Sequence, residues 1–345
     1  MTRRGPSANR PASARGPGKR APVETQIAAL DAATADAASP DARARLREAL
    51  AAGIGLVAAR AAKIIREHAV DGFEAELCAA FRRLRADPVK IDPGCLGKLA
   101  ALEALDFGGS DDAEVFLEAT RTTQPEPAWG PPVDTAVGVR ARGVLALARL
   151  LHPDLSLVAG TLLADPLSPV RQAAAEALAS TGDRALAGPL ALRWELGDED
   201  PLVVLACMTG LLALAPDHAL PRLREALHGG DDGARELAGL ALGQSSRPEA
   251  LDLLLAHLEA APRAAERAPT LRALGLQRHE RALAALLDVV ATGTLADAEA
   301  AIAGLAARRF DPGIREKTRA AARAHPDAAR LEVSYARAFP EDAAR

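Results

Sequence analysis

Residues 165–178 read Asp-Pro-Leu-Ser-Pro-Val-Arg-Gln-Ala-Ala-Ala-Glu-Ala-Leu, and this stretch decides the fold. The Asp-Pro pair is typical of a turn that leads into a helix, and the small residues after it form one packing face at helical spacing. Near-copies of this frame end in leucines that follow one another at steps of 31, 33, 31, 32 and 31 residues. These anchor leucines are Leu147, Leu178, Leu211, Leu242, Leu274 and Leu305. A period of this length predicts an array of stacked helix pairs.

The composition supports a helical core that is built from alanine and leucine. Of the 345 residues 49% are hydrophobic, yet the aromatic ones are only six Phe, two Trp and one Tyr. Alanine loses no side-chain entropy in a helix and lets two backbones approach closely, and no run of alternating β-branched residues competes with it. We therefore predict an all-α fold, an α-solenoid of about eight stacked helix pairs and about sixteen helices, with no strand within residues 46–325.

The charge is unevenly distributed along the chain. Residues 1–24 carry six Arg or Lys against one Glu, so that 36 basic and 45 acidic residues remain beyond them, a net charge of −9. An acidic surface opposes binding to a phosphate backbone, which needs clustered Lys and Arg. We therefore expect no nucleic-acid partner, apart from weak contacts of the basic tail.

Cysteine usage and hydropathy favour a cytoplasmic chain. Cys78, Cys95 and Cys207 are odd in number and widely separated, which is typical of reduced thiols. No apolar stretch is long enough for a membrane span, and no secretion signal follows the first arginines. The basic residues are almost all arginine, which is typical of a GC-rich bacterial genome.

Four segments follow from the pattern. Residues 1–24, rich in Pro, Gly, Ser and Arg, are expected to be a disordered basic tail, and residues 25–45 an Ala-rich lead-in. Residues 46–325 are the repeat array, without a separable domain, and residues 326–345 a capping segment. The array is expected to begin with one long helix from Leu46 to His68.

The repeat unit resembles a known family. Its pattern Asp-Pro-x-x-x-Val-Arg-x-x-Ala-Ala-x-Ala-Leu, followed by Gly-Asp and a second amphipathic helix, is similar to the short HEAT-like repeats of bacterial HEAT-repeat proteins and of phycocyanobilin lyase subunits. The resemblance covers residues 46 to about 325 and implies an armadillo-like helical array. Because the family spans scaffolds, lyases and a few enzymes, the resemblance gives little information about the activity of this chain. In such arrays Arg171, Arg235 and Arg267 are expected to bond the turn of the adjacent repeat.

The regular step is broken twice, at 40 residues from Ile65 to Leu105 and at 42 from Leu105 to Leu147. The excess length falls in residues 86–94 and 122–132, which we call the first and the second insertion. Because equivalent linkers lie along one edge of a stack, we expect the two insertions to be neighbours that form one composite edge site. The candidate partner-binding residues are Lys90, Asp92, Gln124, Glu126, Trp129, Asp134 and Arg140, and in a later repeat Trp194.

The sequence permits two interpretations of Trp129. Set among prolines and carboxylates, it is acceptable as a binding hot spot, or it caps the hydrophobic seam between two repeats. Trp194 is a candidate for another reason, because we expect the second helices of the pairs to line the concave face.

The leading hypothesis for function is a non-catalytic scaffold that binds another protein along its concave face or its looped edge, with no cofactor, metal or catalytic residue. One alternative is a lyase-like or chaperone-like HEAT subunit that acts on a protein-bound cofactor. A second is a HEAT-like DNA glycosylase, for which Trp129, Asp134 and Arg140 supply the residue types. HEAT-like hydroxylases carry several His-Glu pairs on repeated helices, whereas this sequence has only His279-Glu280.

Overall fold

The computed structural model describes residues 22–229 and 231–340. The chain divides into two compact units, one up to Ser110 and one from Asp111 onward. Where the sequence predicts one array without a separable domain, the contacts thus group the residues into two units, and each is described by itself. The described residues contain twenty α-helices, which confirms the all-α fold with more helices than expected. None of these helices has the length and apolar character needed to cross a membrane.

The first unit consists of short helices that pack pairwise, α3 on α6 and α4 on α6. They are α1 Val23–Ala32, α2 Pro40–Ala51, α3 Gly55–Glu67, α4 Glu74–Leu84, α5 Pro88–Ile91 and α6 Leu96–Phe107, with 3₁₀ turns at Ala33–Asp36 and Pro93–Cys95. The expected long helix from Leu46 to His68 is wrong. The chain breaks between α2 and α3 at Gly53, whose φ of 66° lies in the left-handed region that favours glycine.

The structure can be compared with the expected segments at both ends of the described chain. Helix α1 begins at Val23, so the last two residues of the expected tail are helical, while residues 1–21 lie outside the described part. The lead-in of residues 25–45 is largely helical. At the other end, α20 Ala328–Ala338 lies within the expected capping segment, and Tyr335 stacks on Phe339 with ring centroids 4.9 Å apart.

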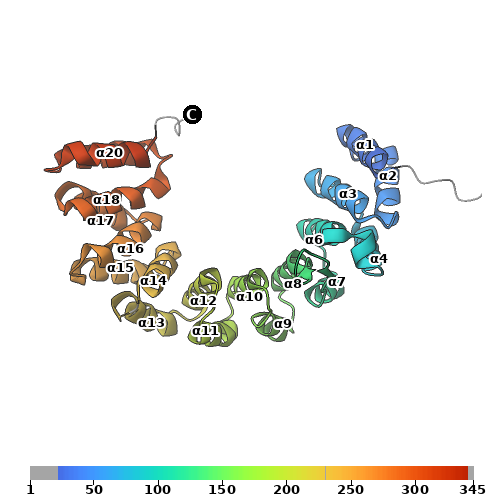
Figure 1. Ribbon diagram of the computed structural model, residues 1–345, viewed down its shortest axis with the longest axis horizontal. Helices are drawn as coiled ribbons and strands as arrows, with labels where there is room; N and C mark the ends of the chain where they lie inside the picture. Colours follow the sequence, from blue (N-terminus) through green and yellow to red (C-terminus); the bar gives the residue numbers. More distant parts are fainter. Residues whose placement is uncertain (1–21, 230, 341–345) are drawn as a thin grey trace, which may run out of the picture. The chain divides into compact units, whose positions relative to one another are not determined.

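The helices of the second unit form two rows (Figure 1). In one row each helix packs on the next, α8 on α10, α10 on α12, and so on to α18. This row, with α20, lies on the inner side of the second unit, and the alternate helices lie on its outer side. The bounds are α7 Ala113–Thr120, α8 Val137–Arg149, α9 Leu155–Leu162, α10 Ser168–Ser180, α11 Ala187–Leu196, α12 Pro201–Leu214, α13 Pro216–Gly229, α14 Asp232–Gln244, α15 Pro248–Ala260, α16 Ala264–Leu276, α17 Glu280–Thr292, α18 Leu295–Leu305, α19 Pro312–Ala324 and α20, with 3₁₀ turns at Arg184–Leu186 and Ala306–Arg308.

The core follows the repeat frame. All six anchor leucines are 0–1% exposed, which confirms that the 31–33-residue spacing marks one buried position per repeat. Glycine allows the closest approaches between helices. A Cβ added at Gly275 would lie 2.1 Å from the carbonyl oxygen of Gly304, so α16 and α18 touch backbone to backbone.

An arginine on the first turn of three inner helices ties one repeat to the next. Three arginines form ion pairs with an aspartate just before or at the start of the next inner helix: Arg140–Asp165, Arg171–Asp198 and Arg267–Asp297. The expectation for Arg171 and Arg267 is therefore confirmed, and the expectation for Arg235 stays a prediction. Arg235 pairs with Asp232 of its own helix and donates to the carbonyl of Leu227, and its charge is among the causes that lower the pKa of Glu266 at the start of α16.

Candidate binding site

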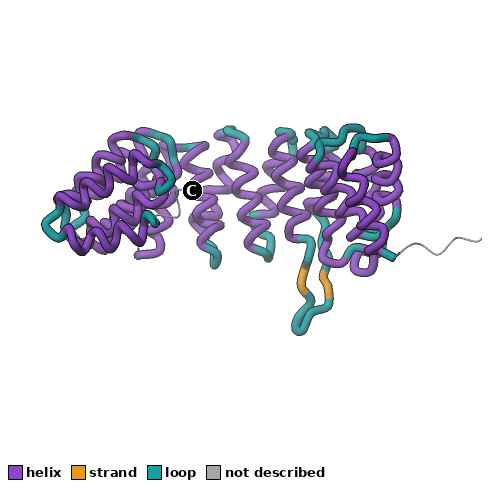
Figure 2. The backbone as a smooth tube through the Cα atoms, turned by 90° about the horizontal axis from the view of Figure 1, so that it is seen from above, coloured by secondary structure: helices purple, strands orange, loops and turns teal. Residues whose placement is uncertain are grey.

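The second insertion forms a β-hairpin that projects from the helices of the second unit (Figure 2). Strands β1 Pro125–Glu126 and β2 Val133–Asp134 pair antiparallel, with Pro125 opposite Asp134 and Glu126 opposite Val133. The expectation that no strand occurs within residues 46–325 is therefore wrong at this one ladder. The reason is that a loop of this length can satisfy its backbone groups by pairing with itself.

Asp134 fixes the base of the hairpin to helix α8. Its carboxylate accepts hydrogen bonds from the backbone N–H groups of Gln124 and Ala136, both at 2.9 Å, and from Arg140 Nη1 at 2.7 Å. Burial by itself would raise the pKa of Asp134, but these three hydrogen bonds and the charge of Arg140 outweigh it and lower the pKa. The carboxylate is thus held ionised where the two strands leave the helices.

Arg140 joins the same base to the next repeat. Its side chain, 3% exposed, donates to the carbonyl of Thr122 at 2.9 Å and to both carboxylate oxygens of Asp165 at 2.9 and 3.2 Å. Burial would lower the pKa of Arg140, but hydrogen bonds to Asp165 and Asp134 raise it. The guanidinium therefore holds three segments together in a fixed geometry.

A second set of hydrogen bonds closes the hairpin from inside. The Gln124 amide, 1% exposed as a residue, donates to Glu126 Oε1 at 2.7 Å, and the Thr135 hydroxyl donates to the same oxygen at 2.8 Å. The Thr135 N–H donates to the carbonyl of Gln124 at 3.0 Å. Sequence analysis missed Thr135, although its place directly after β2 is the signal that could have identified it.

The tip of the hairpin presents Trp129 to solvent. The residue is fully exposed, and the loop around it is Pro127-Ala128-Trp129-Gly130-Pro131-Pro132. The interpretation of Trp129 as a cap on the seam between two repeats is therefore wrong. An indole held away from all helices on a tethered two-stranded arm is placed for contact with another molecule.

Most of the predicted polar rim of this site does not reach the surface. Gln124 and Arg140 are buried, Glu126 and Asp134 are half-buried, and all four bond within the hairpin base. They position the tip and are not its contacts. The glycosylase alternative loses its residue set for the same reason, since Asp134 and Arg140 pair with each other away from Trp129.

The first insertion, unlike the second, places its central acidic residue in the core of its unit. Lys90 is exposed on the short helix α5, but Asp92 is 0% exposed and forms an ion pair of 2.9 Å with Lys98, which is also 0% exposed. The Asp92 carboxylate further accepts from the N–H groups of Gly97 and Lys98 at 2.7 and 3.1 Å, at the start of α6. Asp92 is thus a buried helix cap, which corrects its prediction as a partner contact.

The two insertions lie in different units, the first before Ser110 and the second after Asp111. Their expected adjacency as one composite site stays a prediction. The hairpin lies wholly within the second unit.

Trp194 lies on the outer row and not on the concave side that was expected for second helices. It is part of α11, one of the outer helices (Figure 1), and is half-buried. The Arg222 guanidinium stacks over its ring at 4.2 Å from the centroid. Arg222 also pairs with Glu195. This indole is covered by its own neighbours.

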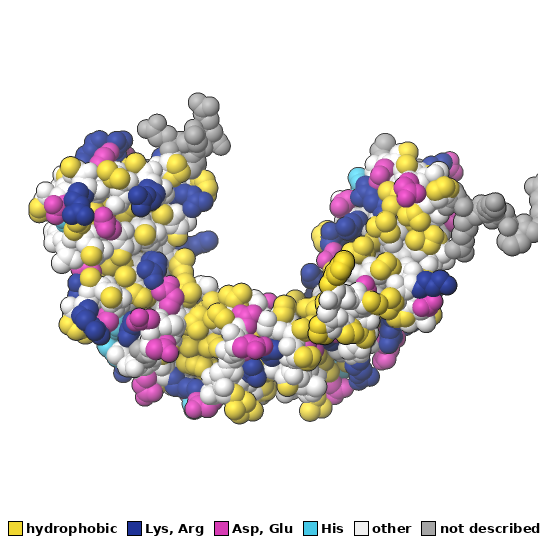
Figure 3. All heavy atoms as spheres, viewed as in Figure 1, with side chains coloured by type: hydrophobic (Ala, Val, Ile, Leu, Met, Phe, Trp, Pro, Cys, Tyr) yellow, Lys and Arg dark blue, Asp and Glu magenta, His cyan; other side chains and the backbone are white. Residues whose placement is uncertain are grey.

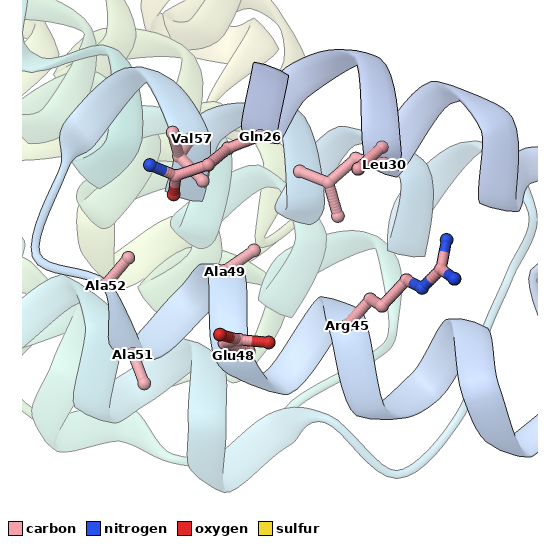
Figure 4. Close-up of a pocket in the computed structure, with 9 residues that line it drawn as sticks. Gln26, Leu30, Arg45, Glu48, Ala49, Ala51, Ala52 and Val57 are labelled. Atoms are coloured by element: carbon pink, nitrogen blue, oxygen red, sulfur yellow. The ribbon is translucent and has the colours of Figure 1, made fainter. Parts of the chain in front are cut away.

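A hollow of about 390 Å³ lies in the first unit, where α1 and α2 diverge (Figure 4). Small or apolar residues such as Leu30, Ala49 and Val57 face it, and Arg45 and Glu48 of α2 stand at its exposed rim. The alanines are too short to fill the space between the helices, so this hollow is a packing gap.

The residues present do not fit a di-iron centre. His279 uses its Nδ1 to accept the N–H of Arg281 and so caps helix α17, and the His279-Glu280 pair is exposed. Within residues 22–229 and 231–340, no group of three or more His, Cys, Asp or Glu could hold a metal ion. All three cysteines are unbridged and buried, and burial raises the pKa of the Cys207 thiol to about 12.

Comparisons with known proteins found no matching family model and no matching curated protein. Among solved structures, human deoxyhypusine hydroxylase in complex with glycerol matches at 20% identity over 84% of this chain and 97% of the hydroxylase, with a TM-score of 0.29. This match is an enzyme, which corrects our leading hypothesis of a non-catalytic scaffold. At this TM-score the likeness carries no argument for hydroxylase chemistry in this chain.

Proposed function

We propose that this chain recognises a protein substrate through the hairpin of residues 125–134 and belongs to the HEAT-like subunits that act on other proteins. The observation that carries the proposal is Trp129, fully exposed at the tip of an arm whose base is fastened by buried polar groups.

The construction of the arm supports recognition. Tryptophan is the residue type most enriched at interface hot spots, and leaving it in water has no benefit for the isolated chain. Four prolines at positions 125, 127, 131 and 132 restrict the loop, so little conformational entropy is lost when a partner binds.

The chemical role of the proposal is that of the lyase-like or chaperone-like subunit, for which the sequence resemblance to phycocyanobilin lyase subunits provides support. In this proposal the hairpin binds the acceptor protein, and the modified group belongs to that protein. We further propose a bacterial, cytoplasmic setting, which the buried and unbridged cysteines support.

The decisive variant is Trp129→Ala. We expect it to weaken binding of the partner captured from the native host by ~2 kcal/mol, or about 30-fold in Kd, as is typical of a hot spot. Calorimetric titration of the purified pair measures this change. Thermal or urea unfolding should show a stability change within ~0.5 kcal/mol, because the side chain has no intramolecular contacts to lose.

Leu157→Ala is the matched control, because Leu157 is an exposed apolar residue (73%) on helix α9 of the same unit. It should leave partner affinity unchanged. Equal affinities for wild-type protein and Trp129→Ala would refute the proposal, and a stability loss of ~3–5 kcal/mol would show that the indole packs within the fold.

A further inference from the structure

Helix α12 departs from its neighbours at two equivalent positions. Six residues before the anchor leucine, the six copies carry Ala141, Gln172, Leu205, Glu236, Ala268 and Glu299. Nine residues before it they carry Gly138, Pro169, Leu202, Gly233, Ala265 and Ala296. Only α12 has a large apolar side chain at either position, and it has leucine at both, one turn apart on the same face.

These two leucines line a groove on the inner row of the second unit. The groove holds a volume of about 460 Å³ and is lined by residues of α10 and α12 and by Gln244 of α14. Leu202 is 52% exposed, Leu205 is half-buried, and Figure 3 shows hydrophobic side chains gathered over α12. The apolar surface is thus concentrated where the other repeats are small or polar.

The floor of the groove also holds a polar atom. Thr209 lines it, and the Thr209 Oγ1 is buried with no hydrogen-bond partner in the described part of the chain. A hydroxyl of this kind favours a ligand that brings a donor or acceptor with it.

The charge at the rim selects the sign of the ligand. Among the described residues that line the groove, Glu176 is the one ionisable side chain, and it is exposed and accepts a hydrogen bond from Gln172 at 2.8 Å. In the next inner helix, α14, the position equivalent to Leu205 is Glu236, which is also acidic and pairs with Arg272. With a net charge of −9 beyond residue 24, the surface favours a cationic partner.

We propose that the groove between α10, α12 and α14 binds an amphipathic basic segment of a partner protein. Its apolar side chains pack against Leu202 and Leu205, and its Lys or Arg lies beside Glu176. This surface is separate from the hairpin tip, so the inference stands independently of the function proposed for Trp129.

The first test uses a fluorescein-labelled synthetic helical peptide with leucines on one face and lysines on the other. Its binding to the full chain is measured by fluorescence polarisation. Leu205→Gln installs the residue that α10 has at the same position, and it should weaken peptide binding by about tenfold or more. Leu192→Gln, at a leucine that is 61% exposed on the outer helix α11, is the control and should bind as the wild type does.

The second test addresses charge. Glu176→Lys should weaken the same peptide at least as strongly, whereas Glu249→Lys on the outer helix α15 should have little effect, because only Glu176 lies at the groove. A peptide with glutamate in place of lysine should not bind. Equal binding of the acidic and basic peptides, or unchanged binding by Leu205→Gln, would overturn the proposal.

Two other occupants are distinguished by further measurements. If deletion of residues 1–21 raises the peptide affinity about tenfold, the groove belongs to the basic N-terminal segment of this chain. If sedimentation shows a dimer that Leu205→Gln dissociates, a second copy covers it. Either result overturns the partner assignment, and unchanged affinity and association state support it.

Discussion

The two insertions lengthen consecutive linkers of the chain by similar amounts, but the first is packed into its unit and the second projects into solvent. The first turns inward and buries Asp92 with Lys98, both 0% exposed. The second turns outward and presents Trp129 at 109% exposure. The length of an insertion thus shows that the repeat pattern is broken, but it does not predict whether the inserted residues are buried or exposed.

Whether an insertion is buried or exposed depends on the residues that it contacts. Gly55 at the start of α3 leaves room for Asp92, since a Cβ at Gly55 would lie 2.1 Å from Asp92 Oδ1. The backbone groups of the second insertion pair with each other, while Asp134 and Arg140 fasten its base.

The largest effect is expected where the inward insertion loses its ion pair. Lys98→Ala leaves the Asp92 carboxylate buried without its cation, and we expect a loss of ~3–5 kcal/mol in the free energy of unfolding. Lys90→Ala removes an exposed lysine from the same insertion and should change stability by less than ~0.5 kcal/mol. Urea titration of both variants measures the contrast. Equal and small losses would mean that the two insertions do not differ as described.

A smaller effect is expected from filling the space that admits the first insertion. Gly55→Ala forces Asp92 or helix α3 to move, and we expect a cost of ~1–3 kcal/mol from overpacking. Gly160→Ala in helix α9 is the control, because an added Cβ there has no atom within 4 Å. The control should be neutral or stabilising by up to ~1 kcal/mol, because alanine is the better helix former. A harmless Gly55→Ala would argue against tight packing at this point.

The smallest effect concerns pH at the base of the outward hairpin. The folded-state pKa of Asp134 lies below its ordinary value of 3.8, so the carboxylate stabilises the fold above that value, and this stabilisation is lost as the pH falls through the folded pKa. The stability difference between wild type and Asp134→Asn should therefore be larger at about pH 7 than at about pH 3. Unfolding titrations at both values test this, and a difference independent of pH would contradict it.

The fold was predictable because each repeat buries one position in a regular frame. The six anchor leucines identify that frame without knowledge of any long-range contact, and Arg171 and Arg267 follow from it. Arg235 shows the limit, because its ion pair with Asp232 lies within its own helix.

The candidate site was predictable only in part. Trp129 was identifiable from its setting among prolines, but the burial of Asp92 depends on Gly55, 37 residues earlier in the chain, and on Lys98. The sequence shows that α12 alone has leucines at two equivalent repeat positions, but only the structure shows the groove that they line with Glu176.

The contrast between the two tryptophans has a spectroscopic consequence. The indole of Trp129 is surrounded by water in the native chain, and that of Trp194 lies under the Arg222 guanidinium. Unfolding therefore changes the surroundings of Trp194 far more than those of Trp129. A protein that covers the hairpin changes the surroundings of Trp129 alone. The intrinsic fluorescence of this chain thus separates loss of structure from occupation of the hairpin, without an attached dye.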